Sequence, residues 1–382
     1  RRAAPSGAMG GRRALSRVKR LVVKVGSGLI TAPGQGPDSK RIGALAADLA
    51  AVIADRREVA LVSSGAIVTG MARLGLETRP RSIPEKQAAA AVGQSALMWH
   101  YEQAFKKHGL MVGQVLLTGQ DISDRGRYLN ARNTLLALLD FDVVPVINEN
   151  DTVAVDEIKV GDNDNLAALV AHLIDADLLV LLTDVDGLYT GDPRRDPSAR
   201  RVDTVAAITG DIQRLVYDGA GGVSVGGMST KLEAAQKAGA SGIPMIIASG
   251  REPSVVTRLL KGEDLGTYFQ PRDDRLAARK RWIAFAVRPQ GRLTVDAGAK
   301  KALTERGKSL LPSGLVEVAG DFQAGEVVAL MEAAGGEFAR GLVNYDAVEL
   351  RKIRGAKTAD IERALGYKGF GEVIHRDNLV VL

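Results

Sequence analysis

Residues 21–28 read LVVKVGSG, and this stretch decides the fold class. Its apolar residues are consecutive, not alternating, which is typical of a strand buried on both faces of a parallel sheet. Similar short apolar runs recur at 59–62, 111–117, 143–147, 178–182 and 244–248. The sequence therefore predicts a parallel sheet whose two faces are covered by other elements.

The segments between these runs have the period of helices. Leu166, Leu169, Val170 and Leu173 recur at the spacing that places side chains on one stripe of a helix, and residues 42, 45, 46 and 49 repeat the pattern. Alternation of strands and helices over 21–270 predicts one doubly wound α/β domain, with three layers and a mainly parallel sheet.

The pattern changes after residue 270. Residues 271–280 are polar and charged and predict a linker, followed by short β-like runs at 282–287, 293–295, 315–318, 327–331 and 342–345. Two helical stretches, 297–306 and 347–354, interrupt these runs. Glycine and proline punctuate the runs at close spacing, so we expect a second, small domain that is β-rich and barrel-like.

The net charge of +6 is unevenly distributed along the 382 residues. Residues 1–20 carry +7, residues 21–270 carry −5 and residues 271–382 carry +4. We interpret 1–20 as a disordered basic extension. The chain has no cysteine, which excludes disulfides, cysteine-ligated metals and thiol catalysis and fits a cytoplasmic location. No apolar run reaches membrane-spanning length, so we expect no membrane partner.

Polar clusters follow four of the predicted strands. Lys24 lies inside the first strand, which runs into Gly26–Gly28. Ser63–Ala66, Asn148–Asp151 and Thr183–Asp184 follow the second, fourth and fifth strands. A fifth polar run, Asp162–Asn165, precedes the Leu166 helix. Ligands of open parallel sheets bind beyond the carboxyl ends of the strands. A buried lysine is costly without an anionic partner, so Lys24 indicates a functional site more than the turn and cap residues do.

A glycine-rich loop, 219–230, leads into a helix that begins near Lys231. Such a junction presents backbone N–H groups and the positive helix end to an anion. There is no P-loop motif, and the four histidines lack the spacing of metal ligands. Two lysines, an anion loop and several Asp and Asn residues predict phosphoryl transfer, with Mg²⁺ carried mainly by substrate phosphates.

Six stretches together resemble the amino acid kinase family, and within it the kinases that act on free glutamate. They are VVKVGSG (22–28), VSSGAI (62–67), PVINENDTV (145–153), KVGDNDNLAALVA (159–171), LLTDVDGLYTGDPR (181–194) and GGMSTKLEAA (226–235). The segment 288–366 resembles a PUA domain. The implied layout is a catalytic domain over 21–270, a linker and first strand over 271–287, the PUA domain, and a tail over 367–382.

The resemblance implies ATP-dependent phosphorylation of the side-chain carboxylate of L-glutamate to L-glutamyl 5-phosphate, the first step of proline biosynthesis. It implies that Lys24 and Lys231 flank the transferring phosphoryl group and that Asp164 orients both lysines. The implied residues for glutamate are Ser64, Gly65, Asp151, Asp162 and Asn163. Those for the nucleotide are Lys24, Thr183, Asp184, Val225, Gly226, Gly227, Met228, Ser229, Thr230 and Lys231.

The resemblance also implies a homo-oligomer and feedback inhibition by proline, which competes at the glutamate site. The polar segment 118–133 lacks strong periodicity, and we expect it to be the mobile, effector-sensitive loop. Two alternatives stay open. One is a sibling kinase, acting on N-acetylglutamate or aspartate. The other is RNA binding through the PUA-like segment, which we disfavour because its surplus of positive charge is modest.

Overall fold

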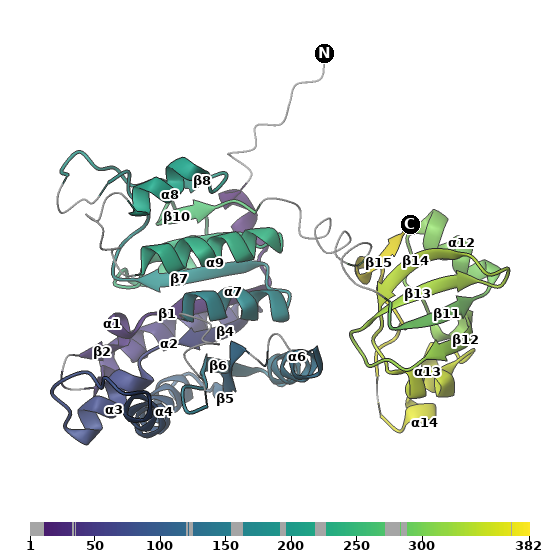
Figure 1. The fold of residues 1–382 in the computed structure, drawn as a ribbon, viewed down its shortest axis with the longest axis horizontal. Helices are drawn as coiled ribbons and strands as arrows, with labels where there is room; N and C mark the ends of the chain where they lie inside the picture. The colour runs from purple at the N-terminus through teal and green to yellow at the C-terminus, as the bar shows by residue number, and fades with distance from the viewer. Residues whose placement is uncertain are drawn as a thin grey trace, which may run out of the picture. The chain divides into compact units, whose positions relative to one another are not determined.

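The computed structural model describes residues 11–382, except 33, 35, 120, 122–124, 154–162, 192–195, 218–226, 272–282, 284–288 and 368. The chain divides into two compact units, 1–272 and 273–382. Figure 1 shows a large sheet with helices in the first unit and a smaller sheet in the second.

An eight-stranded sheet forms the centre of the first unit, in the order β5-β6-β4-β1-β7-β9-β10-β8. The six apolar runs predicted from the sequence all lie in this sheet, in strands that pair in parallel. The exception to parallel pairing is β10, which runs antiparallel to β9. The strands are β1 (Arg20–Val25), β4 (Glu58–Ser63), β5 (Met111–Leu117), β6 (Val143–Glu149), β7 (Leu178–Thr183), β8 (Thr204–Val205), β9 (Met245–Ser249) and β10 (Thr267–Phe269).

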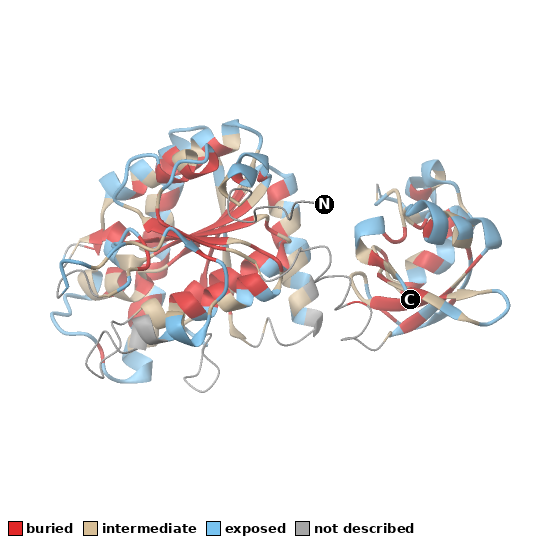
Figure 2. Ribbon diagram, turned by 90° about the horizontal axis from the view of Figure 1, so that it is seen from above, coloured by how far each residue is buried: buried red, intermediate tan, exposed pale blue. Residues whose placement is uncertain are grey.

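Helices cover both faces of this sheet, which confirms the predicted three-layer architecture. One apolar core includes side chains of α2, α4 and α10, and the other includes side chains of α6, α7 and α9. Figure 2 shows the buried residues concentrated in the strands and on adjoining helix surfaces. The helices are α1 (Ser27–Ile30), α2 (Ser39–Ala54), α3 (Ala66–Leu74), α4 (Ile83–Lys106), α6 (Arg125–Asp140), α7 (Asn163–Leu173), α8 (Gly210–Tyr217), α9 (Met228–Ala240) and α10 (Val255–Leu260). A hairpin of β2 (Thr31–Ala32) and β3 (Gly36–Pro37) lies between α1 and α2 in the chain.

The expectation that residues 1–20 are disordered is wrong from Gly11 onward. Arg12–Arg17 form a short 3₁₀ helix in which Leu15 is buried, and Arg20 begins β1. The guanidinium of Arg12 donates to the backbone carbonyls of Asp203, Leu265 and Gly266. The basic composition of this segment suggested disorder, but Leu15 and Arg12 bind it to the first unit through burial and hydrogen bonds.

The expectation of a loop over 118–133 is also wrong for its second half. Helix α6 already begins at Arg125, and its Arg132 pairs with Asp175 at 2.9 Å. The apolar residues that anchor this helix, Leu135 and Leu139, lie beyond the segment whose periodicity was weak. The segment 118–133 therefore lacked the apolar residues whose periodicity would have predicted the helix.

The second unit is built on a five-stranded sheet in the order β12-β11-β13-β14-β15. Its strands are β11 (Gly291–Val295), β12 (Leu315–Gly320), β13 (Val327–Glu332), β14 (Glu337–Leu342) and β15 (Leu379–Val381). Its helices are α12 (Ala297–Arg306), α13 (Ala347–Ile353) and α14 (Ile361–Leu365). They share an apolar core with the sheet.

Three of the predicted β-like runs of this unit lie in β11, β12 and β13, whereas the run 342–345 is wrong beyond Leu342. The predicted linker 271–280 lies outside the described residues apart from Pro271, and the run 282–287 lies outside them apart from Ile283. Among the described helices, none combines the length and the apolar character that a membrane span requires.

Candidate active site

Lys24 reaches the candidate site from the central strand of the first unit. In β1 the residues Leu21, Val23 and Val25 belong to one core, and Val22 belongs to the other. Side chains alternate along a strand, so Lys24 faces the same side as Val22, toward α7 and α9. It is only 5% exposed, and its neighbours in the sheet are Val62 and Leu181. A lysine so placed needs an anionic partner.

Asp164, in the first turn of α7, is that partner. Its Oδ1 lies 2.6 Å from Nζ of Lys24, and its Oδ2 lies 3.0 Å from Nζ of Lys231. The carboxylate is fully buried, and each lysine is buried as well. A single aspartate therefore holds two ammonium groups that come from different elements, β1 and α9.

The electrostatics of these three residues favour an added anion. Burial disfavours the charged form of Asp164, but Lys24 and Lys231 outweigh burial and hold the pKa of Asp164 below its ordinary value. The aspartate is therefore ionised at neutral pH. Two ammonium groups and one carboxylate leave one excess positive charge in a buried place, which is costly unless an anion binds there.

Gly227 determines the conformation at the start of α9, where Lys231 lies. It has a φ of 114°, a left-handed conformation that favours glycine, and it precedes the first residue of the helix. Its carbonyl accepts from Nζ of Lys231 at 3.0 Å, and from Oγ1 of Thr230 at 2.9 Å. Oγ1 of Thr230 also lies 3.1 Å from Oδ2 of Asp164, so its single hydroxyl hydrogen can be directed to either acceptor. The helix start is thereby fixed to the buried aspartate.

Asn163, the residue before Asp164, ties the ends of two strands together. Its Nδ2 lies within hydrogen-bond distance of the Ser63 carbonyl (3.0 Å), Oγ of Ser64 (2.8 Å) and Oδ1 of Asn148 (3.0 Å). Ser63 and Ser64 follow β4, and Asn148 lies in β6. The predicted convergence of these polar clusters is therefore present in the structure.

A further residue of this network is one that sequence reasoning missed. Gln94 in α4 is buried, and its Oε1 accepts from Nδ2 of Asn148 at 2.8 Å. This bond fixes which end of the Asn148 amide faces Asn163. The only signal in the sequence is an amide within the alanine-rich stretch of 88–96, and nothing there identifies its partner.

Other predicted residues are placed less closely. Thr183 donates to Oδ1 of Asp184 at 3.0 Å at the end of β7, the strand next to β1, and Asp184 is exposed. Asp151 is half-buried just after β6, and Gly65 is the residue before α3. Met228 and Ser229 lie in the first turn of α9. Asp162, Val225 and Gly226 lie outside the described residues.

Both helices that begin at this place, α7 and α9, direct their N-terminal ends toward it. The ends of helices where N–H groups are unpaired attract anions. Within the described residues there is no group of three or more His, Asp or Glu side chains that could hold a metal ion. The two helix ends therefore suit the site to an anionic ligand.

Comparison with known proteins agrees with this chemistry. The family model for the amino acid kinase family matches residues 19–249, and that for the PUA domain matches residues 291–365. The chain is 51% identical to the glutamate 5-kinase of Moorella thermoacetica, over 97% of this chain and 98% of that protein. It is 53% identical to the glutamate 5-kinase of Myxococcus xanthus, over 97% of this chain and 98% of that protein. A glutamate 5-kinase of a Geobacter strain is 51% identical over 96% of this chain and 99% of its own length.

Proposed function

We propose the following reaction and residue roles for this chain, which belongs to the amino acid kinase family and is a glutamate 5-kinase. It transfers the γ-phosphoryl group of ATP to the side-chain carboxylate of L-glutamate. The products are L-glutamyl 5-phosphate and ADP, and the reaction is the first step of proline biosynthesis. The buried excess positive charge of Lys24, Lys231 and Asp164 is the observation that carries the proposal.

In the proposed reaction, Lys24 and Lys231 flank the γ-phosphoryl group and neutralise the charge that develops on its oxygens. A carboxylate oxygen of glutamate attacks the phosphorus atom, and the bond from phosphorus to the leaving oxygen of ADP breaks. The attacking carboxylate is already ionised, so no general base is required. Catalysis of this kind rests on positioning and charge stabilisation. Asp164 sets the separation of the two ammonium groups.

The glutamate substrate binds beside this triad, on the side of β4 and β6. We assign Ser64, Gly65 and Asn163 to its binding, which the hydrogen bond between Asn163 and Ser64 supports. Asp151 is the proposed partner of the α-ammonium group. Asp162, which precedes Asn163 in the chain, is proposed to support that contact.

The nucleotide binds on the side of β7 and α9. We assign Thr183, Asp184 and the segment 225–231 to it, because they follow β7 or form the start of α9. Mg²⁺ is proposed to arrive on the phosphates of ATP, where it would neutralise part of their charge. The buried Asp164 fits this view, because both of its oxygens are already engaged by lysines.

Further properties of the chain belong to the same proposal. The enzyme acts as a cytoplasmic homo-oligomer, and proline competes with glutamate at its site. The catalytic domain spans 21–270, and the PUA domain spans 288–366. For the PUA domain we favour a role in assembly or modulation over RNA binding, because +4 over residues 271–382 is a small surplus. Binding of RNA by the full chain that weakens steeply with salt would reverse this preference.

The direct test is ATP-dependent formation of an acyl phosphate, trapped with hydroxylamine as the hydroxamate. We expect the hydroxamate with L-glutamate, equimolar ADP, and a lower rate when proline is added at low glutamate. Aspartate and N-acetylglutamate are the matched controls, since each also presents a side-chain carboxylate. Product with one of these and none with glutamate would assign the chain to a sibling kinase.

A further inference from the structure

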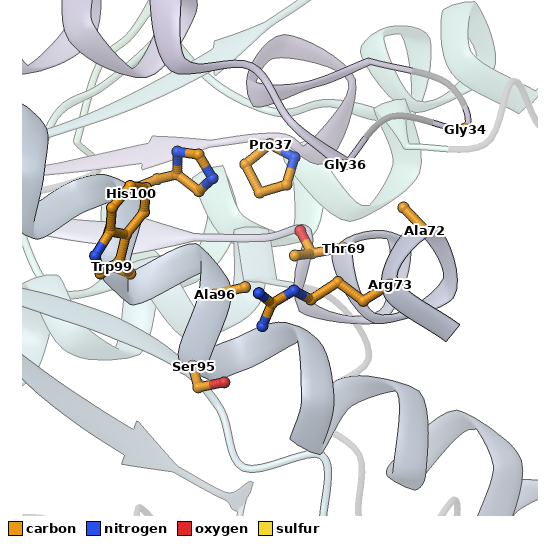
Figure 3. Close-up of a pocket in the computed structure, with 10 residues that line it drawn as sticks. All are labelled: Gly34, Gly36, Pro37, Thr69, Ala72, Arg73, Ser95, Ala96, Trp99 and His100. Carbon is orange, nitrogen blue, oxygen red and sulfur yellow. The ribbon is translucent and has the colours of Figure 1, made fainter. Parts of the chain in front are cut away.

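A second cavity lies in the first unit, outside the candidate active site. Its volume is about 540 Å³, within the range of roughly 300–1,000 Å³ that is usual for small-molecule sites. Figure 3 shows its walls: Thr69 and Arg73 from α3, Ser95, Trp99 and His100 from α4, and Pro37 from β3. None of the residues assigned to glutamate or ATP lines it.

Among the lining residues of this cavity, Arg73 carries a positive charge at neutral pH, whereas His100, whose pKa is lowered, is neutral there. None of its lining residues is an aspartate or a glutamate. Arg73 makes no ion pair with any described residue. It lies close enough to His100 for its charge to affect the pKa of the imidazole. Burial, and then the charge of Arg73, lower the pKa of His100. Arg73 is itself exposed, so its guanidinium group is solvated and remains available to an anion that enters the cavity.

Thr69 adds a polar group that lacks a partner. The residue is fully buried, and its Oγ1 forms no hydrogen bond with the described residues. A threonine in a helix commonly donates to the carbonyl four residues earlier, as Thr304 does to Lys300 at 2.9 Å. In α3 the carbonyl of Gly65 instead accepts the backbone N–H of Thr69, at 2.9 Å, and not its hydroxyl. Buried polar groups in proteins are nearly always paired, so this hydroxyl is open to a partner outside the protein, either a water molecule or a ligand atom.

We propose that this cavity binds a small organic anion, carrying a carboxylate or a phosphate group. Arg73 forms charge-assisted hydrogen bonds with the anionic group, which its planar guanidinium suits. Thr69 donates its hydroxyl to an oxygen of the ligand, and the indole of Trp99 covers the apolar part. The site is distinct from that of the phosphoryl transfer, and it needs neither Lys24 nor Lys231.

Trp99 supplies the measurement. The chain has two tryptophans, Trp99 and Trp282, so the W282F variant leaves Trp99 as the sole tryptophan reporter. We would titrate the full-length variant with inorganic phosphate, with citrate and with potassium chloride at matched ionic strength. The expected result is a saturable change in Trp99 fluorescence with phosphate or citrate and none with chloride. The probe with the higher affinity identifies the anionic group as phosphate or carboxylate.

Three substitutions made in the W282F background give this test its controls. R73Q should weaken binding about tenfold or more, because a charged hydrogen-bond partner is lost. R79Q, an exposed arginine outside the cavity, should leave binding unchanged. K24A should also leave the fluorescence response unchanged, which separates this cavity from phosphate bound at the active site.

T69V distinguishes a ligand contact from a structural role. It removes a hydroxyl that has no internal hydrogen bond, so the melting temperature should stay the same or rise while anion binding weakens. The proposal would be overturned if W282F with and without R73Q gave equal fluorescence responses to the anions. A response that follows ionic strength alone would overturn it too. A Trp99 signal that depends on protein concentration and not on the anions would overturn it too, since a second copy would then fill the cavity.

Discussion

Lys24 Nζ lies 2.6 Å from Oδ1 of Asp164, and this ion pair joins strand β1 to the first turn of α7. The other oxygen of the same carboxylate, Oδ2, binds Lys231. The separation of the two ammonium groups is therefore set by the width of one carboxylate. Because all three residues are buried, neither lysine can move toward a phosphoryl group without affecting the aspartate that it shares with the other.

Replacing Lys24 should separate activity from stability. K24M should lower turnover by a factor on the order of 10²–10³, because the charge on the transferring group loses one of its two partners. The melting temperature should hold or rise, since a neutral buried pair of Asp164 and Lys231 remains. Hydroxamate formation and thermal unfolding measure the two effects. K40M, at an exposed position of α2, is the control, and near-normal turnover in K24M would remove Lys24 from the mechanism.

Replacing Asp164, in contrast to replacing Lys24, should lower the stability of the fold. D164N leaves two buried ammonium groups without a carboxylate, and removal of one member of a buried ion pair costs about 3–5 kcal/mol. Urea unfolding at pH 7 measures this loss. D55N changes an exposed carboxylate that pairs with Arg57, so its effect should stay below about 1 kcal/mol.

The pH dependence of the unfolding free energy gives a second test of D164N. The folded-state pKa of Asp164 lies below its unfolded value, so the stabilisation is complete above about pH 4 and is lost as pH falls through the folded-state pKa. The difference in unfolding free energy between wild type and D164N should therefore shrink below about pH 4. A difference that stays constant down to pH 2 would contradict the assignment of that stability to the ionised carboxylate.

The sequence predicts the sheet of the first unit well, because its central strands are continuous apolar runs. It predicts β14 poorly, because the buried residues of that strand include Ala339 and Gly341, which are too small to produce an apolar pattern. The buried residues Val343 and Tyr345, which suggested a strand, lie just after β14 instead.

The candidate site shows the same division. Lys24 stands out because a lysine within an apolar strand contradicts its surroundings, and Asp162–Asn165 stands out because one helix cap does not need four polar residues. Gln94 does not stand out, because its importance depends on the contact between α4 and β6. Tertiary contacts of this kind have no local pattern, and the bond from Asn148 Nδ2 to Gln94 Oε1 is visible only in the structure.

Gln94 should affect the binding of glutamate more than that of ATP. It does not belong to the residues proposed to touch substrate, but it holds the Asn148 amide in the orientation that receives Asn163. Q94L removes one hydrogen bond of about 1 kcal/mol, so KM for glutamate should rise about five- to tenfold. KM for ATP should change less than about twofold, because Gln94 shares no partner with the residues assigned to the nucleotide.

Steady-state kinetics with each substrate varied in turn would test this assignment. Q103L is the matched control, because Gln103 lies in the same helix but is exposed. Equal changes in both KM values would instead indicate a general loss of structure in Q94L. A change in KM for ATP alone would place Gln94 in a different part of the site.

The close packing of α3 against α4 supplies the last prediction. A Cβ atom at Gly93 would lie 1.8 Å from the carbonyl oxygen of Ala66 and 2.4 Å from the backbone nitrogen of Gly70. Both are backbone atoms, so G93A must separate the two helices, at a cost of about 2 kcal/mol or more. Ala66 directly follows Ser64 and Gly65, so the same displacement should raise KM for glutamate. G43A is the control, since its added Cβ meets no atom within 4 Å in α2 and should stabilise the chain by about 0.5–1 kcal/mol. Thermal and urea unfolding of both variants would decide the matter, and a G93A variant as stable as wild type would show that α3 and α4 can separate without loss.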